Sequence, residues 1–586
     1  MCRIFSDNVV GIRVQYVLEL DSFGRPTPNL FSYSNQWIGS WEECLSISTE
    51  EKPSYRTQFC YVSVVLSSSL DFSGKKTADI CNTKYSVKWS VCMPKVCNNT
   101  DITAILNILN KRLSNNLLKF CSVECKPTEK PGTTVGYWII LIFGCIAVAL
   151  VIIATFFDYC ISANDKNTRK LLGEIDATIS IKYLLSFSLY SNASDLLNTD
   201  IKPGHIHSVH ALKVLSLTWV IYGHTYSLFV LSDNLIDVFD APKHRLAQGA
   251  FTGAFNAVDT FFFISGLLLG YIFFHHIKQN REHINQPRFW LLIYLHRYFR
   301  LGIAYFIFLA FEINFYDRLS FGPLSLPFLN VMDAKKCRQY WWRNVLFINA
   351  MYVNRDECMG HTWYLASEMQ LFLYAPLILV PLAYSITAGV TAAGLITAMF
   401  LVFNYFVYYK YNFPINHFGF NKSIFDENKV EQYELILYKP FWSHAIPYII
   451  GVFTGYFLDN IRGRKLHLSR LIVISMWLAI CSCAYGILFG LHSYYMDTEH
   501  GMSIFERASY NFWCKIGWSV IIAWVIIACE QNFAGPVKTL LEWNFWIPFS
   551  RMCYAMYIVH VSVISMVAVK HDRQFHFTNL GFMVCN

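Results

Sequence analysis

The feature that most constrains this chain is an apolar run from Gly136 to Phe157, GYWIILIFGCIAVALVIIATFF. A helix of about 20 apolar residues spans the ~30 Å hydrocarbon core of a bilayer, so this run predicts a transmembrane helix. Further apolar stretches are centred at 211–231, 250–274, 293–312, 370–386, 388–408, 444–458, 471–491, 513–530 and 552–569. Hydrophobic residues make up 54% of the 586 residues and charged residues only 15%, which excludes an ordinary soluble protein. We therefore predict an all-α polytopic membrane protein with about ten transmembrane helices.

Residues 1–130 differ from the rest of the chain in their cysteine content. They contain no histidine and eight of the 18 cysteines: Cys2, Cys44, Cys60, Cys81, Cys92, Cys97, Cys121 and Cys125. An even number of cysteines before a transmembrane helix favours disulfides in an oxidising compartment. A zinc site is the alternative, but it needs four thiolates here, and the segment lacks paired Cys-x-x-Cys motifs.

One helix is expected in this N-terminal segment. Apolar residues recur on one helical face after a cap near Thr100: Ile102, Ile105, Leu106, Leu109 and Leu113. We predict a small, disulfide-rich, helix-containing ectodomain over 1–130.

The disulfides set the expected orientation of the chain. If residues 1–130 are extracellular or lumenal, the linker over 158–204, which follows the helix at 136–157, is cytosolic and carries several lysines and arginines, as positive-inside topology requires. The loops at 313–369 and 409–437 then lie on the ectodomain side, where Cys337 and Cys358 are expected to pair and the sequon at Asn421 to carry a glycan. The sequon at Asn192 lies on the cytosolic side and is expected to stay unmodified. The protein is predicted to reside in the plasma membrane or an endomembrane.

Two titratable residues interrupt the apolar run at 211–231. Lys213 and His224 are eleven residues apart, which is three helical turns plus about 20°, so both project from nearly one face. Ionisable groups inside a membrane usually face a bundle interior or a water-filled cavity and mark functional sites. The alternative is that Lys213 extends to the headgroups and His224 lies at the opposite interface. The spacing alone leaves both interpretations open.

Other polar residues lie at the ends of apolar runs. Arg297 and Arg300, three residues apart in YLHRYFRLG, share a helical face and suit bidentate phosphate binding, although ordinary anchoring of a helix end is equally compatible. Glu368 stands alone in HTWYLASEMQ, where simple solvation at the interface is the alternative. Gly266 and Gly270 have the spacing of closely packed membrane helices.

Nine segments, two near the N-terminus and seven in the apolar part of the chain, resemble one known family in order. LDSFGRP and WIGSWEECLSI in the first 50 residues are similar to its N-terminal domain. VLSLTWVIYGHTY, VDTFFFISG, RYFRL, CRQYWWRNVLFIN, CMGHTWYLASEMQ, YKPFWSHAIPYIIG and SRMCYAMYIVH are similar to its membrane domain. The chain resembles the animal nose resistant to fluoxetine family, which joins a cysteine-rich N-terminal domain to an acyltransferase 3 membrane domain. The resemblance implies that residues 205–586 form that membrane domain and that the family's sequence continues beyond the last residue here.

The resemblance also implies a chemistry. Members of the acyltransferase 3 family carry an Arg, ten residues and a His in the first helix of the catalytic domain, and they move acyl groups, typically from acyl-coenzyme A, to hydroxyls of lipids, carbohydrates or small acceptors. Here the histidine is His224, whereas Lys213 replaces the arginine. A histidine in a cavity suits a general base or a transient acyl acceptor, and a cation suits a phosphate or a developing negative charge.

The predicted site follows from this resemblance. His224, Lys213 and Glu368 are the expected catalytic residues, and Arg297, Arg300 and His444 are expected to bind acyl-coenzyme A. The family usually has arginine where this chain has His444, and tryptophan where it has His361.

Three functions remain to be compared. The first is an acyl-coenzyme A-dependent acyltransferase acting on an unidentified small acceptor, surrounded by membrane lipids. The second is a transporter or uptake component for lipids and xenobiotics, with which worm members of the family are associated, and the third is a non-catalytic scaffold. The net charge of +8 is spread over loops, so we expect no nucleic-acid partner, and no metal is expected.

Overall fold

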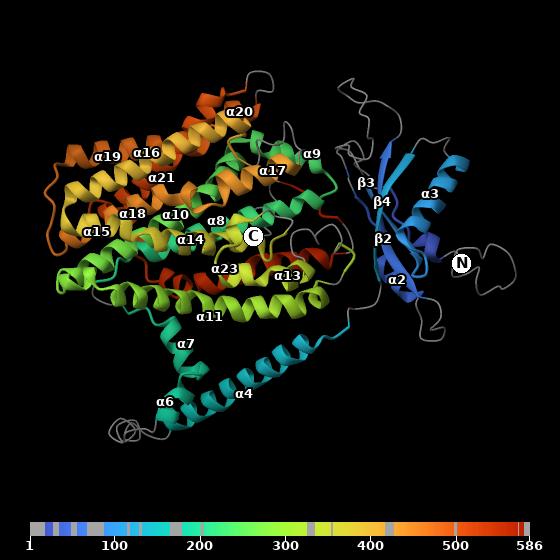
Figure 1. Ribbon diagram of the computed structural model, residues 1–586, viewed down its shortest axis with the longest axis horizontal. Helices are drawn as coiled ribbons and strands as arrows, with labels where there is room; N and C mark the ends of the chain where they lie inside the picture. Colours follow the sequence, from blue (N-terminus) through green and yellow to red (C-terminus); the bar gives the residue numbers. More distant parts are fainter. Residues whose placement is uncertain are drawn as a thin grey trace.

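The computed structural model of the chain describes most residues and all the elements discussed below (Figure 1). The described residues are 18–26, 34, 36–47, 56–66, 87–113, 118–127, 132–163, 179–200, 204–320, 322–324, 334–352, 356–416, 427–496, 501–571 and 574–578. Cys2, Cys81 and the sequon at Asn421 lie outside these residues.

The N-terminal domain is built on a four-stranded sheet. Its strand order is β1-β3-β2-β4, with β1 parallel to β3 and the other neighbours antiparallel. The strands are β1 (Gln36–Trp37), β2 (Thr57–Leu66), β3 (Val87–Pro94) and β4 (Leu118–Pro127), and the helices are α2 (Trp41–Ser46) and α3 (Asn99–Leu113). Alternate residues of the central strand β2 pack on opposite faces: Cys60 and Val62 join the cluster that contains α3, and Phe59 and Tyr61 join the one that contains α2. The sheet therefore lies between two helices.

The sequence predicted a helix in this domain and did not predict the sheet. The helix itself is confirmed, since Ile102 and Leu106 are buried in the face that was expected to pack. Its cap is Asn98, whose Oδ1 accepts hydrogen bonds from the Asp101 amide and the Thr100 hydroxyl, so the helix begins slightly earlier than expected.

Disulfides cross the sheet, as the cysteine content predicts. Cys60 on β2 bonds Cys125 on β4, and Cys44 on α2 bonds Cys92 on β3. Cys97 and Cys121 are also disulfide-bonded. The expected pair Cys337–Cys358 is confirmed in the membrane domain, with an S–S distance of 2.02 Å.

The membrane domain is a bundle of long helices that run roughly parallel in Figure 1. The helix that enters it and the short helices that follow are α4 (Val135–Ala163), α6 (Ile179–Leu185) and α7 (Leu189–Leu197). The long helices are α8 (Ser208–Leu228), α10 (Arg245–Ile277), α11 (Pro287–Leu319), α14 (Trp363–Tyr374), α15 (Pro376–Tyr384), α16 (Ile386–Tyr411), α18 (Ala445–Asn460), α19 (Arg470–Phe489), α21 (Ile504–Glu530) and α23 (Trp546–Val569). Shorter helices connect them: α9 (Leu235–Asp240), α13 (Ala334–Val345), α17 (Glu427–Tyr433), α20 (His492–Met496) and α22 (Pro536–Leu541), with single turns η3 (Phe229–Leu231), η4 (Ala241–Lys243), η5 (Arg281–Asn285), η6 (Asn349–Met351), η8 (Gly360–Thr362), η10 (Glu434–Tyr438) and η11 (Phe441–His444).

The number of membrane spans differs from the expected count. Within the described residues, eight helical segments are long and apolar enough to cross a membrane, so about ten spans are not confirmed. The expected spans at 211–231 and 444–458 correspond to α8 and α18, which are not among the eight. The reason is physical: α8 carries Lys213 and two histidines, and α18 has only 16 residues. Both helices contribute buried residues to the hydrophobic clusters of the bundle.

Glycines allow the backbones of α10 and α18 to pack closely at the centre of the bundle. A Cβ on Gly266 or Gly270 of α10 would collide with the backbone of α18, at Tyr448 and Val452 respectively. Gly451 and Gly455 of α18 face the backbone of α10 in the same way. The close packing predicted from the Gly266–Gly270 spacing is thus observed.

The N-terminal domain contacts one end of this bundle. The Tyr61 hydroxyl donates to the carbonyl of Pro323 (2.7 Å), and Ser34 hydrogen-bonds Gln574 (3.1 Å) beyond the end of α23. We call this the N-domain end of the bundle. In Figure 1 the sheet lies at the right and α4 runs apart from the other long helices, in keeping with its largely exposed surface.

Candidate functional site

His224 of helix α8 lies close to two other histidines near the N-domain end of the bundle. His224 lies one turn before the end of α8 at Leu228, His361 lies in η8 at the start of α14, and His560 lies near the middle of α23. The ring centroids of His224 and His560 are 5.1 Å apart, and those of His361 and His560 are 5.4 Å apart. We call these three residues the histidine cluster.

Backbone carbonyls determine which ring nitrogens of the cluster carry protons. His361 Nε2 lies 3.1 Å from the carbonyl oxygen of Ile558, and His560 Nδ1 lies 2.7 Å from that of Tyr557. A carbonyl oxygen only accepts, so each of these nitrogens donates. The other nitrogens, Nδ1 of His361 and Nε2 of His560, are buried and make no hydrogen bond to the described part of the protein. The cluster therefore holds two basic nitrogens oriented by the backbone and available to a ligand.

The C-terminal helix α23 supports this arrangement with one row of side chains. Arg551 donates to carbonyls at the end of α7, including those of Leu196 (2.9 Å) and Asn198 (2.7 Å). Tyr554 donates to the carbonyl of Leu301 on α11, and Tyr557 donates to that of His361 (2.8 Å). Through these hydrogen bonds, side chains along SRMCYAMYIVH connect α23 to α7, to α11 and to the histidine cluster.

Lys213 lies toward the other end of α8. It is eleven residues from His224, about 16 Å along the helix axis. Arg300 on α11 lies near enough to repel its ammonium group, and Cys553 on α23 also lies near it. Since His224 contacts His560 on α23, both residues project toward the same neighbouring helix, in agreement with the shared face predicted from their spacing.

Arg297 and Arg300 do not act as a pair in the structure. Arg297 points into the bundle, where it pairs with Glu368 of α14, donates to the Ser265 hydroxyl of α10 (3.0 Å) and lies over the Phe372 ring at 4.0 Å. Ser265 in turn donates to Glu368 Oε1. Arg300 is exposed and lies near Lys213 instead. The two arginines therefore serve different environments.

The Arg297–Glu368 pair retains unused hydrogen-bonding capacity. Nε of Arg297 and Oε2 of Glu368 are buried and make no hydrogen bond to the described residues. The Glu368 side chain is only 6% exposed. A polar group at this position would therefore find a donor and an acceptor that the protein leaves free.

His444 has a different environment from the one predicted for a coenzyme ligand. It is buried, its ring stacks on Phe262 at 4.5 Å, and its Nδ1 lies 2.6 Å from Oδ1 of Asp259. Its Nε2 lies 2.8 Å from the carbonyl oxygen of Tyr438 and donates to it. Both nitrogens of His444 are engaged by the protein, so in this arrangement neither is available to acyl-coenzyme A.

The predicted residues thus occupy separate levels of one bundle. The structure brings His224 together with His361 and His560, pairs Glu368 with Arg297 and His444 with Asp259, and places the like-charged Arg300 near Lys213. The prediction did not include His361 and His560 as site residues. In the described part of the chain, no three His, Cys, Asp or Glu side chains are placed to hold a metal ion.

Comparison with known proteins agrees with this division into two parts. Residues 206–585 match a family described as an acyltransferase domain, and residues 17–106 match the N-terminal domain of nose resistant-to-fluoxetine proteins. A similar protein is "Nose resistant to fluoxetine protein 6" of Caenorhabditis elegans, 25% identical over 616 residues that cover 96% of this chain and 74% of the relative. No solved structure matches the chain.

Proposed function

Because the chain belongs to the nose resistant to fluoxetine family, with its N-terminal domain ahead of an acyltransferase domain, we propose that it transfers an acyl group from acyl-coenzyme A to a hydroxyl group of a lipid, carbohydrate or other small acceptor. The observation that carries the proposal is the histidine cluster. Backbone carbonyls hold His361 and His560 each in one tautomer, which leaves Nδ1 of His361 and Nε2 of His560 buried and able to accept a proton.

The cluster suits proton transfer to and from the reacting groups. As the acceptor oxygen attacks the thioester carbonyl, His224 takes the hydroxyl proton, the new C–O bond forms and the C–S bond breaks. The proton then passes to the departing thiolate of coenzyme A, so the reaction consumes no other reagent. His560 lies against His224 and is the nearest group able to share this proton.

Lys213 and Arg300 are proposed to bind the phosphates of the donor. Lys213 lies toward the opposite end of α8, about 16 Å from His224 along the helix axis. Arg300 lies near enough for the two like charges to repel each other, which a bound phosphate would relieve. Coenzyme A is extended between its phosphates and its sulfur, so one donor molecule is able to contact both levels. Lysine at position 213 keeps the charge of the family's arginine but loses its planar fork.

Glu368 is proposed to act with Arg297 rather than alone. Its free Oε2 and the free Nε of Arg297 offer an acceptor and a donor to a polar group of a substrate. His444 is proposed to contribute through Asp259, which it contacts, and not through coenzyme A directly.

The disulfides support an orientation with the N-terminal domain outside the cytosol. The described pairs Cys44–Cys92 and Cys60–Cys125 favour an extracellular or lumenal compartment. In that orientation the histidine cluster lies toward the extracellular or lumenal side of a multi-pass membrane protein, and Lys213 lies toward the cytosol, where acyl-coenzyme A is made available.

Release of coenzyme A thiol by purified protein tests the proposal. We expect the purified wild-type protein to turn over an acyl-coenzyme A when native membrane extract supplies the acceptor. We expect His224→Ala to lose this turnover while keeping the gel-filtration profile and yield of the wild type. His467→Ala, an exposed histidine in the loop before α19, is the matched control and is expected to keep full turnover. Equal turnover in all three proteins rejects the catalytic role and favours the transporter or scaffold alternatives.

A further inference from the structure

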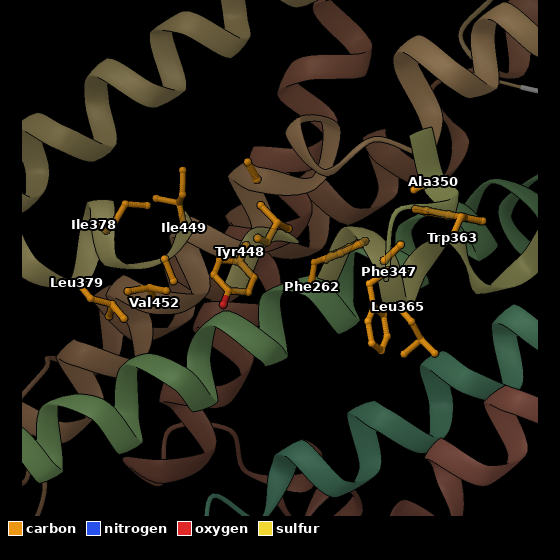
Figure 2. Packing of buried hydrophobic residues seen from close by; sticks show 14 of the residues in the cluster. Phe262, Phe347, Ala350, Trp363, Leu365, Ile378, Leu379, Tyr448, Ile449 and Val452 are labelled. Carbon is orange, nitrogen blue, oxygen red and sulfur yellow. The ribbon is translucent and has the colours of Figure 1, made fainter. Parts of the chain in front are cut away.

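A cavity of about 490 Å³ lies between helices α15, α16 and α18, away from the histidine cluster. Its volume is within the ~300–1,000 Å³ typical of ligand sites. Its walls are aliphatic and aromatic side chains, and none of the lining residues is charged. Figure 2 shows part of this wall, with Ile378, Ile449 and Val452 on one side of Tyr448 and Phe262 on the other.

The backbone explains why the cavity exists. Helix α14 ends at Tyr374, and Pro376 starts α15 without an amide hydrogen for the preceding turn, so the path of the chain changes there. The α15–α16 hairpin is tightly closed near its turn, where a Cβ on Gly389 would collide with Leu382. Residues of both helices line the cavity, and α18 contributes the small residue Ala445 and Tyr448 to its wall.

The cavity opens on the outer surface of the bundle. Leu377 of α15 and Met399 of α16 line it and are both 59% exposed. Both residues belong to segments long and apolar enough to cross a membrane, Gly360–Tyr384 and Ile386–Tyr411. The mouth therefore faces the hydrocarbon region of the bilayer.

Physical chemistry limits what fills this space. Water needs two or more polar partners in a buried site, and these walls offer almost none. An empty cavity leaves its lining atoms without dispersion partners. An ionised carboxylate would be buried without a counter-charge, because no lysine, arginine or histidine lines the walls. An uncharged hydrocarbon chain satisfies all three conditions.

We propose that this cavity binds one acyl chain of a bilayer phospholipid, which enters sideways between α15 and α16 while its headgroup stays outside. Association within a membrane comes from packing rather than from removal of apolar surface from water, so the fit of the chain to these walls decides occupancy. The chain ends against Tyr448, whose hydroxyl is buried without a hydrogen-bond partner among the described residues and interacts electrostatically with Arg297. The site is separate from the histidine cluster and does not depend on acyl transfer.

Photolabelling tests the proposal with the full-length protein in vesicles of phosphatidylcholine. A small fraction of that lipid carries a diazirine in one acyl chain, and labelled peptides are identified by mass spectrometry after irradiation. We expect labels concentrated on cavity-lining positions of α15, α16 and α18. Ile396→Trp, which fills the cavity from α16, should lower this labelling several-fold.

Leu395, the neighbour of Ile396 in the sequence, supplies a matched control. Leu395 is 68% exposed and does not line the cavity, so Leu395→Trp adds the same side chain at the same depth and should leave the labelling unchanged. If Ile396→Trp fails to fold by gel filtration, Met399→Trp at the mouth replaces it. Equal labelling in filled and control variants overturns the proposal. So do labels spread evenly over the outer faces of α4 and α19, or labelling by a diazirine-bearing free fatty acid but not by the phospholipid.

Discussion

The Arg297–Glu368 pair leads to the most quantitative prediction. The two side chains are 22% and 6% exposed, so removing one partner leaves the other charge largely buried. Breaking a buried pair from one side typically costs ~3–5 kcal/mol, whereas replacing both partners by apolar residues of similar volume is often neutral or stabilising. Because Arg297 is partly exposed, we expect about 3 kcal/mol for Glu368→Met or Arg297→Met alone, and little or no loss for the double variant.

The assay is the lifetime of the folded protein in detergent. Large membrane proteins usually unfold irreversibly, so the half-life at a fixed temperature, followed by gel filtration, is a better measure than an equilibrium constant. If the whole loss appears in the unfolding rate, about 3 kcal/mol shortens the half-life by roughly 10²-fold. The double variant should regain most of this lifetime.

Activity separates a structural role of the pair from a functional one. If Glu368 and Arg297 also bind substrate through their free Oε2 and Nε, the double variant will be stable but will not transfer acyl groups. A double variant as short-lived as the worse single variant refutes the reasoning, because it shows that the two charges do not compensate each other.

Three other predictions concern the loops and the topology. Replacing Cys337 and Cys358 by alanine opens a loop of 21 residues and should cost about 3 kcal/mol, seen as a lower unfolding temperature; an unchanged temperature contradicts this. Glu357 precedes η8, is buried, and accepts a hydrogen bond from Nζ of Lys439 at 2.7 Å. Burial outweighs this partner and raises the pKa of Glu357 to about 7, above its ordinary value of 4.5, so its contribution to stability is complete below pH 4.5 and is lost as the pH rises through about 7. Glu357→Gln should flatten the dependence of the unfolding temperature over pH 5–8, and an equally steep dependence rules this group out. Glycosidase treatment should shift the mass through the sequon at Asn421 and not through Asn192; the reverse pattern overturns the orientation.

The sequence predicted the parts of the fold that depend on one segment at a time. The run at Gly136–Phe157 is a helix because its length and composition suffice, and α3 buries the residues that its period places on one face. Strand β2 was not anticipated because both of its faces are covered, so its buried residues are continuous and do not alternate with polar ones. Helix α8 was predicted from its apolar residues, and the structure adds that its polar residues meet other helices within the bundle.

The sequence predicted only those features of the site that lie on a single helix. The eleven-residue spacing of Lys213 and His224 follows from helix geometry, and the structure turns both toward α23. The partners of His224 come from positions 361 and 560, and only the packing of three separate helices brings them together. The arginines three residues apart in YLHRYFRLG also show the limit of periodicity, because Arg297 pairs with the buried Glu368 of α14 whereas Arg300 stays exposed.

The departure at His444 has a structural explanation. A cation at this position faces the buried carboxylate of Asp259, which also interacts electrostatically with Lys515. A histidine shares one proton with that carboxylate and so keeps it from being an isolated buried charge. The contact between His444 and Asp259 therefore bears first on the packing of α10 against η11.

The most direct test of the account measures whether His224 and His560 act as one unit. The kcat/KM for acyl transfer from an acyl-coenzyme A is determined for the wild type, His224→Ala, His560→Ala and the double variant, with folding checked by gel filtration. Loss of a proton-transfer group typically lowers the rate by ~10²–10⁴-fold, and losses within one unit do not multiply. We predict a loss of that size in each single variant and no further loss in the double variant. Losses that multiply, or single variants with wild-type rates, would contradict a shared role of the two histidines in acyl transfer.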